Sequence, residues 1–347
     1  MRRAAVLAVD GGGSKTDVAL LRKDGSVLGA TRVAGADWDG RTWATWGHME
    51  ETQLVPIHAA IAEAAQRAGF DPDRRPLADV GSFCLAGADL PSDDRRLLTW
   101  MRRNGWTKEP ILRNDTFAVL RAGTERTWGV AVVCGYGTNC AAVSPDGKIA
   151  RFPAIGPISG DWGGGSELGG LAAWHAIRSQ DGRGPKTALQ RSVPAFFGLR
   201  TPRQLMETVY FGKISEERLA ELAPLVFREA GDGDAIAREL IDRQADEIVT
   251  MASTAIRRLR MRDLDVDVVL GGGIFRNPDR GFFDRIRDGL AAQAPRAAIR
   301  RLTEPPIIGA ALIGLDALGA SKAARSAARE RLTHERLTRH TPGRKET

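Results

Sequence analysis

The stretch Asp10-Gly11-Gly12-Gly13-Ser14-Lys15-Thr16 decides the fold class of this chain. An apolar run precedes it and Thr16 to Leu21 alternates after it, which predicts a strand, a glycine hairpin and a second strand. The turn Lys23-Asp24-Gly25 and the run Val27 to Val33 then predict a third strand. Glycine allows positive φ and lets backbone N–H groups approach a ligand, usually a polyphosphate, without a Cβ in the way.

Two better-known phosphate motifs do not fit this stretch. A P-loop has glycine immediately before its lysine and a helix after it, whereas Ser14 precedes Lys15 here and a strand follows. A dinucleotide fingerprint also leads into a helix, whereas the residues after these glycines show period two. The stretch therefore predicts a phosphate-binding hairpin between antiparallel strands.

The same plan recurs in the second half of the chain. The apolar run Trp128 to Cys134 leads into the turn Gly135-Tyr136-Gly137-Thr138-Asn139, and Cys140 to Val143 continues the pattern. Pro145-Asp146-Gly147 then predicts another turn before Lys148 to Phe152. The two halves therefore indicate two similarly built domains. A third glycine turn, Gly271-Gly272-Gly273, follows the apolar run 268–270.

The remaining periodicities predict an α/β protein whose sheets are flanked by helices. We expect an N-terminal domain over 1–118, a C-terminal domain over 119–304, and a terminal helix over 305–320. That helix could return to the first domain or simply cap the chain, and its contacts decide between the two. Residues 321–347 are expected to form a basic, flexible tail, either a frayed helix or a disordered extension. Further helices are expected at 49–68, 93–104, 115–122, 163–177, 234–259 and 278–292, and further strands at 80–85, 111–113, 267–270 and 298–302.

Composition indicates a cytoplasmic protein without nucleic-acid or membrane partners. The 347 residues are 43% apolar with a mean hydropathy of −0.24, and no run is long enough to span a membrane. The strand near Met1 leaves no room for a cleavable signal. The formal charge is +7, but residues 321–347 hold eight Lys or Arg against three Glu, so the remainder is nearly neutral.

Cysteine and histidine spacing predicts neither disulfides nor a zinc site. Cys84, Cys134 and Cys140 lack CxxC spacing and lie in or beside predicted strands, as reduced core residues do. The five histidines show no metal-binding spacing. Whether the protein forms a homodimer is left open.

The motifs together resemble the actin, hexokinase and heat-shock ATPase superfamily, and more narrowly the BadF/BadG/BcrA/BcrD ATPase family with its N-acetylglucosamine and glucosamine kinase relatives. The likeness runs from residue 4 to about 318 and implies two RNase H-like domains with a nucleotide cleft between them. It is carried by residues 9–16, Arg113-Asn114-Asp115, residues 135–139, Ser159-Gly160-Asp161 and Gly271-Gly272-Gly273-Ile274.

This resemblance implies ATP and Mg²⁺ as cofactors. Backbone N–H groups of residues 11–14 and 135–139 are expected to hold the phosphates, with the hydroxyls of Ser14, Thr16 and Thr138 as further donors. Gly271 to Gly273 are the third expected ATP contact. Asp10 is the expected magnesium ligand, through water, although it could instead bond backbone amides of its own hairpin. Lys15 either contacts phosphate or points to solvent.

Asp115 is the candidate general base. It follows a short strand at the start of a helix, where the sugar hydroxyl and the γ-phosphate are expected to meet. The alternative is that Asn114 or Asp115 caps that helix, and the two roles are compatible. Both residues are also expected to contact the sugar.

The resemblance further implies a sugar site on the loop 156–169, where Asp161 accepts ring hydroxyls and the backbone near Gly156 lines the pocket. Asp37 and Asp39 are additional candidates, with an ordinary loop turn as the alternative. The chain departs from the family pattern at Tyr136 and at Trp162, which could stack on a sugar or pack at the helix entry.

The predicted function is an ATP-dependent kinase acting on the 6-hydroxyl of N-acetylglucosamine or glucosamine. One alternative is an ATPase that activates a 2-hydroxyacyl-CoA dehydratase or benzoyl-CoA reductase through an iron–sulfur cluster, which needs exposed cysteines. The other is a sensor of sugar or nucleotide that has lost catalysis.

Overall fold

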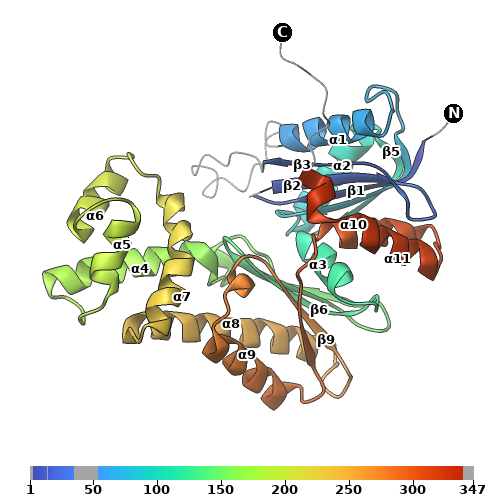
Figure 1. Ribbon diagram of the computed structural model, residues 1–347. Helices are drawn as coiled ribbons and strands as arrows, with labels where there is room; N and C mark the ends of the chain where they lie inside the picture. The colour runs from blue at the N-terminus through green and yellow to red at the C-terminus, as the bar shows by residue number, and fades with distance from the viewer. Residues whose placement is uncertain (1–2, 14, 35–53, 339–347) are drawn as a thin grey trace, which may run out of the picture. The chain divides into compact units, whose positions relative to one another are not determined.

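The computed structural model describes residues 3–13, 15–34 and 54–338 of the chain. The chain divides into two compact units: residues up to Trp128 together with those from Leu302 onward, and Gly129 to Arg301. Figure 1 shows the elements of both. The first boundary lies ten residues beyond the expected 118, because the helix that starts at Asp115 packs within the first unit.

The first unit is built on a mixed five-stranded sheet in the order β3-β2-β1-β4-β5. β1 pairs antiparallel with β2, and β2 with β3, whereas β1, β4 and β5 are parallel neighbours. The three strands predicted around the first glycine hairpin are therefore the antiparallel half of this sheet. The strands are β1 (Ala4–Gly11), β2 (Lys15–Leu21), β3 (Val27–Ala34), β4 (Ala78–Leu85) and β5 (Thr107–Arg113).

Successive side chains of β1 point to opposite faces of this sheet, and helices cover both faces. Leu7 and Val9 pack in one core with α1 (Val55–Arg67) and α2 (Pro91–Asn104). Val6 and Ala8 pack in a second core with α3 (Asp115–Gly123) and α10 (Ile307–Ala317). The expected terminal helix is α10, and its contacts with β1 and α3 show that it returns to the first unit.

The prediction of a flexible tail is wrong for residues 321–338. They form α11 (Lys322–Arg331) and α12 (His334–Thr338), whose apolar residues Ala324, Ala328, Leu332 and Leu337 join the second core. α11 lies so close to the β2–β3 turn that a Cβ on Gly25 would stand 1.9 Å from the Ala324 carbonyl oxygen. Lys322 and Arg331 are exposed, whereas Arg329 donates to the carbonyls of Arg121 and Thr124 at 3.0 and 2.9 Å. The apolar spacing of this helix was overlooked in the sequence.

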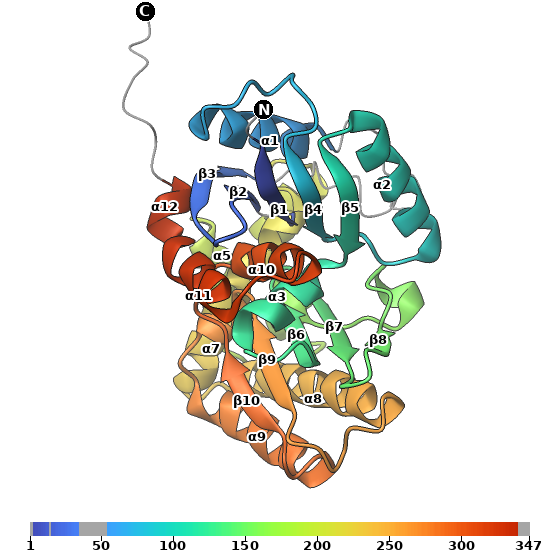
Figure 2. The same cartoon turned by 90° about the vertical axis from the view of Figure 1, so that its right-hand side faces the viewer.

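The second unit repeats the sheet of the first. Its order is β10-β9-β6-β7-β8, in which β6, β7 and β8 are antiparallel neighbours and β6, β9 and β10 are parallel ones. Read from β8 to β10, the connectivity matches that from β3 to β5, as Figure 2 shows for each sheet. The strands are β6 (Gly129–Cys134), β7 (Thr138–Val143), β8 (Ile149–Arg151), β9 (Asp267–Gly271) and β10 (Ala298–Arg301).

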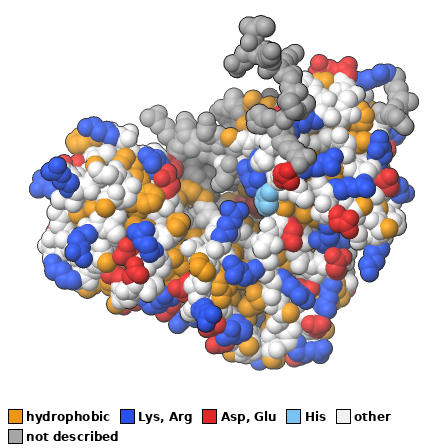
Figure 3. Space-filling view, in the orientation of Figure 1, with side chains coloured by type: hydrophobic (Ala, Val, Ile, Leu, Met, Phe, Trp, Pro, Cys, Tyr) orange, Lys and Arg blue, Asp and Glu red, His pale blue; other side chains and the backbone are white. Residues whose placement is uncertain are grey.

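The helices of the second unit include a long one, α8, that packs on β6 and β7 and also contacts α9. No helix within the described residues is both long and apolar enough to cross a membrane. On the face drawn in Figure 3, acidic and basic side chains are intermixed. The helices are α4 (Gly164–Asp181), α5 (Leu189–Phe196), α6 (Pro202–Tyr210), α7 (Ala223–Gly231), α8 (Ala235–Arg258) and α9 (Arg280–Gln293), with short 3₁₀ turns at Pro157–Ser159, Glu216–Leu222 and Ile274–Arg276.

Candidate active site

Three carboxylates follow the three parallel strands of the first sheet. Asp10 stands near the end of β1, Asp89 comes four residues after β4, and Asp115 two residues after β5. In the strand register Asp10 lies opposite Cys84, and Cys84 lies opposite Arg113. Because the carboxyl ends of parallel strands meet at one edge of a sheet, the three acids share that edge.

Asp10 lies in a chain of charges that crosses β1, β2 and β3. It is only 7% exposed, and it stands directly opposite Asp17 in the antiparallel register. The Lys15 ammonium bridges the two carboxylates, with Nζ 3.2 Å from Asp10 Oδ2 and 2.7 Å from Asp17 Oδ2. Arg32 donates two further hydrogen bonds to Asp17, at 2.6 and 2.8 Å. Lys15 therefore does not point away to solvent, and Arg32 and Asp17 are partners that the sequence analysis missed.

The charge of Asp10 is incompletely compensated. Burial raises the pKa of Asp10 above its ordinary value, although Lys15 pulls that pKa down. A carboxylate held in this way is stabilised by an additional cation.

Asn114, not Asp115, caps α3. The Asn114 Oδ1 atom accepts the backbone N–H of Thr116 at 3.0 Å and its hydroxyl at 2.7 Å. The Asn114 Nδ2 atom donates to Asp89 Oδ1 at 3.1 Å, and both residues are buried. Of the two residues that could cap the helix, it is therefore Asn114 that does so. Asp89, which the sequence analysis did not name, is a further carboxylate beside it.

Asp115 lies at the first position of α3 and stays partly accessible. Burial and then the charges of Asp10 and Asp89 raise the pKa of Asp115 to about 7, while backbone amides at the helix start oppose this. Because burial and the neighbouring negative charges both disfavour its ionised form, Asp115 can accept a proton near neutral pH.

The glycine hairpin of the second unit joins β6 to β7 and is closed by the Gly135 N–H, which donates to the Gly137 carbonyl at 2.9 Å. Thr138 is buried, and its hydroxyl lies 3.2 Å from Cys134 Sγ. Asn139 accepts the Cys140 N–H at 2.7 Å through its side chain. The Asn139 carboxamide oxygen is therefore used within the hairpin.

The start of α4 packs directly on this hairpin. The N–H groups of Gly165 and Ser166 donate to the carbonyls of Gly135 and Tyr136 at 2.8 and 2.9 Å. A Cβ on Gly164, where φ is +86°, would stand 2.4 Å from the Tyr136 carbonyl oxygen. Close backbone packing thus explains part of the glycine content of the loop 156–169. The contact with Ser166 is made by the Tyr136 backbone carbonyl, so it does not depend on the unusual tyrosine side chain at this position.

Close packing also explains why residue 272 is glycine. A Cβ there would stand 2.3 Å from the Cys134 carbonyl oxygen, and its φ is +111°. Four other glycines in the three glycine turns have neither a left-handed conformation nor a close neighbour within the described residues. A Cβ on any of them would meet no atom closer than 3.7 Å. They are Gly12, Gly135, Gly137 and Gly273. Their identity fits backbone that must be approached by a ligand.

Asp161 and Gly156, the two residues of the expected sugar loop, contact each other. The Asp161 Oδ2 atom accepts the Gly156 N–H at 2.8 Å and the Ser159 hydroxyl at 2.7 Å. Next to it, the Arg243 guanidinium stacks over the Trp162 ring at 4.0 Å. Glu247, one turn further along α8, has its pKa raised by burial, with Arg243 opposing and Asp161 adding to the shift. Arg243 and Glu247 gave no sequence signal, because nothing in α8 alone shows which loop it faces.

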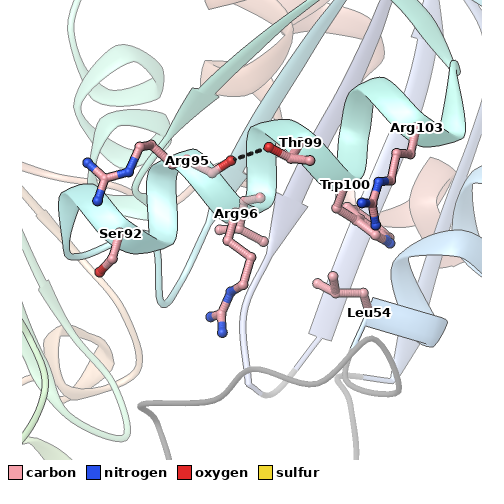
Figure 4. A pocket seen from close by; sticks show the side chains of 8 residues that line it. Leu54, Ser92, Arg95, Arg96, Thr99, Trp100 and Arg103 are labelled. Atoms are coloured by element: carbon pink, nitrogen blue, oxygen red, sulfur yellow. Dashed lines mark hydrogen bonds between the residues drawn. The ribbon is translucent and has the colours of Figure 1, made fainter.

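Three of the predicted site residues, Ser14, Asp37 and Asp39, lie outside the described residues. A separate hollow on α2 is lined by Leu54, Ser92, Trp100 and several arginines (Figure 4). None of its described lining residues is a predicted site residue or a carboxylate, so we do not assign the chemistry to it.

Comparison with known proteins supports the family that the motifs resemble. The chain belongs to the BadF/BadG/BcrA/BcrD ATPase family, whose model matches residues 7–314. A relative in Clostridium acetobutylicum, named N-acetylmuramic acid/N-acetylglucosamine kinase, is 26% identical over 89% of this chain and 97% of its own. The N-acetyl-D-glucosamine kinase of Dictyostelium discoideum is also 26% identical, over 91% and 99%.

Solved structures agree on the fold. A putative N-acetylglucosamine kinase from Chromobacterium violaceum superposes with a TM-score of 0.66 at 24% identity, covering 90% of this chain and 99% of that one. The ROK hexokinase of Thermus thermophilus gives a TM-score of 0.51 at 16% identity, covering 91% and 99%. The predicted family and the predicted fold class of two mixed sheets flanked by helices are thereby confirmed.

Proposed function

We propose that this protein transfers the γ-phosphate of MgATP to the 6-hydroxyl of an amino sugar, N-acetylglucosamine or glucosamine, with Asp115 as general base. The proposal rests on the different roles of two neighbouring residues at the start of α3. Asn114 satisfies the helix end, and Asp115 is a partly accessible carboxylate with a pKa of about 7. A base of that strength accepts a hydroxyl proton efficiently at neutral pH.

Phosphoryl transfer requires positioning and charge neutralisation more than covalent chemistry. In this proposal the backbone N–H groups of residues 11–13 and 135–139, the turn 271–273 and the hydroxyls of Thr16 and Thr138 hold the nucleotide phosphates. The unexplained glycines at 12, 135, 137 and 273 support this, because each leaves backbone open to approach.

Asp10 is the residue proposed to hold Mg²⁺. The raised pKa of this carboxylate fits a neighbouring cation. Within the described residues no three His, Cys, Asp or Glu side chains gather as a metal site, so the remaining ligands would be water and phosphate oxygens. When bound, the ion neutralises charge on the β- and γ-phosphates.

The sugar is assigned to Asp161 and the backbone at Gly156, with Asn114 and Asp115 at the reacting hydroxyl. One Asp161 oxygen is anchored by Gly156 and Ser159, which fixes the carboxylate for directional hydrogen bonds to ring hydroxyls. The names of the curated relatives support an amino sugar as acceptor.

No observation favours the alternative of an electron-carrying ATPase. Cys84, Cys134 and Cys140 are all buried, whereas a cluster shared between two subunits needs cysteines at a surface. A sensor that has lost catalysis is not favoured either, because Asp10 and Asp115 are both in place.

A coupled assay that follows ADP release tests the proposal, with N-acetylglucosamine, glucosamine, N-acetylmuramic acid, glucose and N-acetylmannosamine offered with MgATP. We expect turnover with at least one 2-amino sugar, at least tenfold faster than with glucose, and little ADP release without sugar. If no acceptor stimulates ADP release, while calorimetry still shows nucleotide binding, the protein is a sensor and the proposal is wrong.

A further inference from the structure

The most unusual polar group in the second unit is the side chain of Gln244. It lies on α8 and is completely buried. Its Oε1 atom accepts the N–H of Gly164 at 2.7 Å, across 80 residues of sequence. Its Nε2 atom has no hydrogen-bond partner within the described part of the chain. A buried amide donor without a partner costs free energy, so its retention requires an explanation.

The surroundings of Gln244 show where that donor lies. A Cβ on Gly163 would stand 2.7 Å from Gln244 Nε2 and 2.9 Å from Thr138 Oγ1. The carboxamide and the Thr138 hydroxyl therefore border the same small region beside Gly163. Gly163 has a φ of +106°, and only a residue without a side chain fits beside these two groups. One residue of α8 thus contacts the start of α4 and borders the phosphate hairpin.

The Thr138 hydroxyl has a single proton and two lone pairs. In the structure its oxygen lies 3.2 Å from Cys134 Sγ, an arrangement in which either atom could donate. When the hydroxyl donates its proton to a phosphate oxygen, its lone pairs must be satisfied by donors from the protein side. Gln244 Nε2 does not bond the Thr138 hydroxyl in this structure, but it borders the same region and is an unused donor within the described residues.

The geometry points to Gln244 as a positioning residue for nucleotide phosphate. Its Oε1 atom holds the start of α4 against the hairpin, and its Nε2 atom orients the Thr138 hydroxyl as a donor to the phosphate. This inference rests on the proposed function, since it takes the hairpin 135–139 to be a phosphate site. The bond that Gln244 would orient runs from the Thr138 hydroxyl to a charged phosphate oxygen and is worth about 1.5–3 kcal/mol, so its loss weakens binding roughly 10- to 100-fold in Kd.

Two variants separate the two halves of the carboxamide. Gln244→Met keeps the side-chain length and removes both hydrogen-bonding groups, and Gln244→Glu keeps an acceptor for Gly164 but replaces the donor. The matched control is Gln190→Met on α5, which removes an acceptor that Ser179 uses at 2.9 Å in the same unit. The full-length protein is titrated calorimetrically with the magnesium complex of a non-hydrolysable ATP analogue and, separately, with N-acetylglucosamine.

We expect both Gln244 variants to bind the analogue at least tenfold more weakly than the parent, with sugar affinity changed less than threefold and with a higher KM for ATP. Gln190→Met should bind the analogue as the parent does. Parent-like analogue affinity in a folded Gln244→Glu variant overturns the inference, even if Gln244→Met fails to fold. If the parent itself binds no nucleotide, the proposed function fails instead, and the two failures are thereby distinguished.

Discussion

The Asn114 side chain caps α3 by accepting the Thr116 N–H at 3.0 Å, and this leaves the carboxylate of the next residue, Asp115, outside the cap. Asn114 also donates to Asp89, so the cap is fixed from both sides. Asp115 is held beside two other carboxylates at a position where a protein built only for stability would avoid a third negative charge. This arrangement makes stability and activity oppose each other at one residue.

Asp115→Asn is therefore expected to stabilise the protein at neutral and alkaline pH. The folded pKa of about 7 lies above the ordinary value of 3.8, so the folded state holds the proton more tightly than the unfolded state does. Between those values the parent loses stability as pH rises, whereas the asparagine variant does not incur this cost. The gain in unfolding free energy should be on the order of 1–3 kcal/mol larger at pH 8 than at pH 4.

Urea unfolding of both proteins at pH 4, 6 and 8 measures this difference. Asp146→Asn is a suitable control, because Asp146 is a solvent-exposed carboxylate whose pKa is lowered to about 2 by Lys148 and Ser144. Its substitution should give no gain at pH 8. An Asp115→Asn gain that is the same at all three pH values would show that folding does not raise the pKa of Asp115.

The pH dependence of turnover follows from the same group. A general base must be deprotonated, so kcat/KM for the sugar at saturating MgATP should fall about tenfold per pH unit below the pKa of Asp115. We expect this limb near or somewhat below pH 7, because a cation at Asp10 offsets part of the repulsion that raises the pKa. A flat profile between pH 5 and 8 would argue against Asp115 as the base.

Gly164→Ala should disrupt the junction between α4 and the hairpin 135–139. The added Cβ would stand 2.4 Å from the Tyr136 carbonyl oxygen at a φ of +86°, so we expect a loss of about 2 kcal/mol or more in unfolding free energy. Gly170 provides the control within the same helix, because a Cβ there meets nothing within 4 Å. Gly170→Ala should gain about 0.5–1 kcal/mol, since alanine favours the helix. Equal effects of the two substitutions in thermal unfolding would contradict the close packing described here.

Lys15→Met tests the charge chain on β1 and β2. Removing the ammonium leaves Asp10 without its ion pair and Asp17 with Arg32 alone, so the variant should lose roughly 1–3 kcal/mol of stability at pH 7. The loss should shrink as pH falls and Asp10 protonates. Lys148→Met breaks an exposed pair with Asp146 and should cost less than about 1 kcal/mol in the same unfolding measurement. A Lys15→Met loss no larger than this control would mean that the bridge contributes little.

The sequence was informative wherever a local pattern determines the structure. Period-two runs around 10–16 and 135–139 predicted both hairpins and the repeated plan, because alternation and glycine turns are local signals. The short strand before Asn114 also led to Asp115. Asp89 could have been found by the same reasoning, because it follows the strand at 80–85.

Other features depend on partners that are distant in sequence. Gln244 bonds Gly164 and Arg243 stacks on Trp162, in each case a partner some 80 residues away. The sequence of α8 alone does not predict either contact. The segment 321–338 was misjudged because its charge was weighed before its apolar spacing. Its packing depends on contacts such as Arg336 to the Val27 carbonyl across 309 residues.

The most direct test of the account compares Asp115→Asn with the parent in the transfer of radiolabelled γ-phosphate from ATP to N-acetylglucosamine or glucosamine, whichever the parent accepts. The account predicts that transfer falls by about 10²–10⁴-fold in the variant while calorimetric affinity for the nucleotide analogue changes less than threefold. Transfer by Asp115→Asn at the rate of the parent would contradict the assignment of Asp115 and, with it, the proposed mechanism.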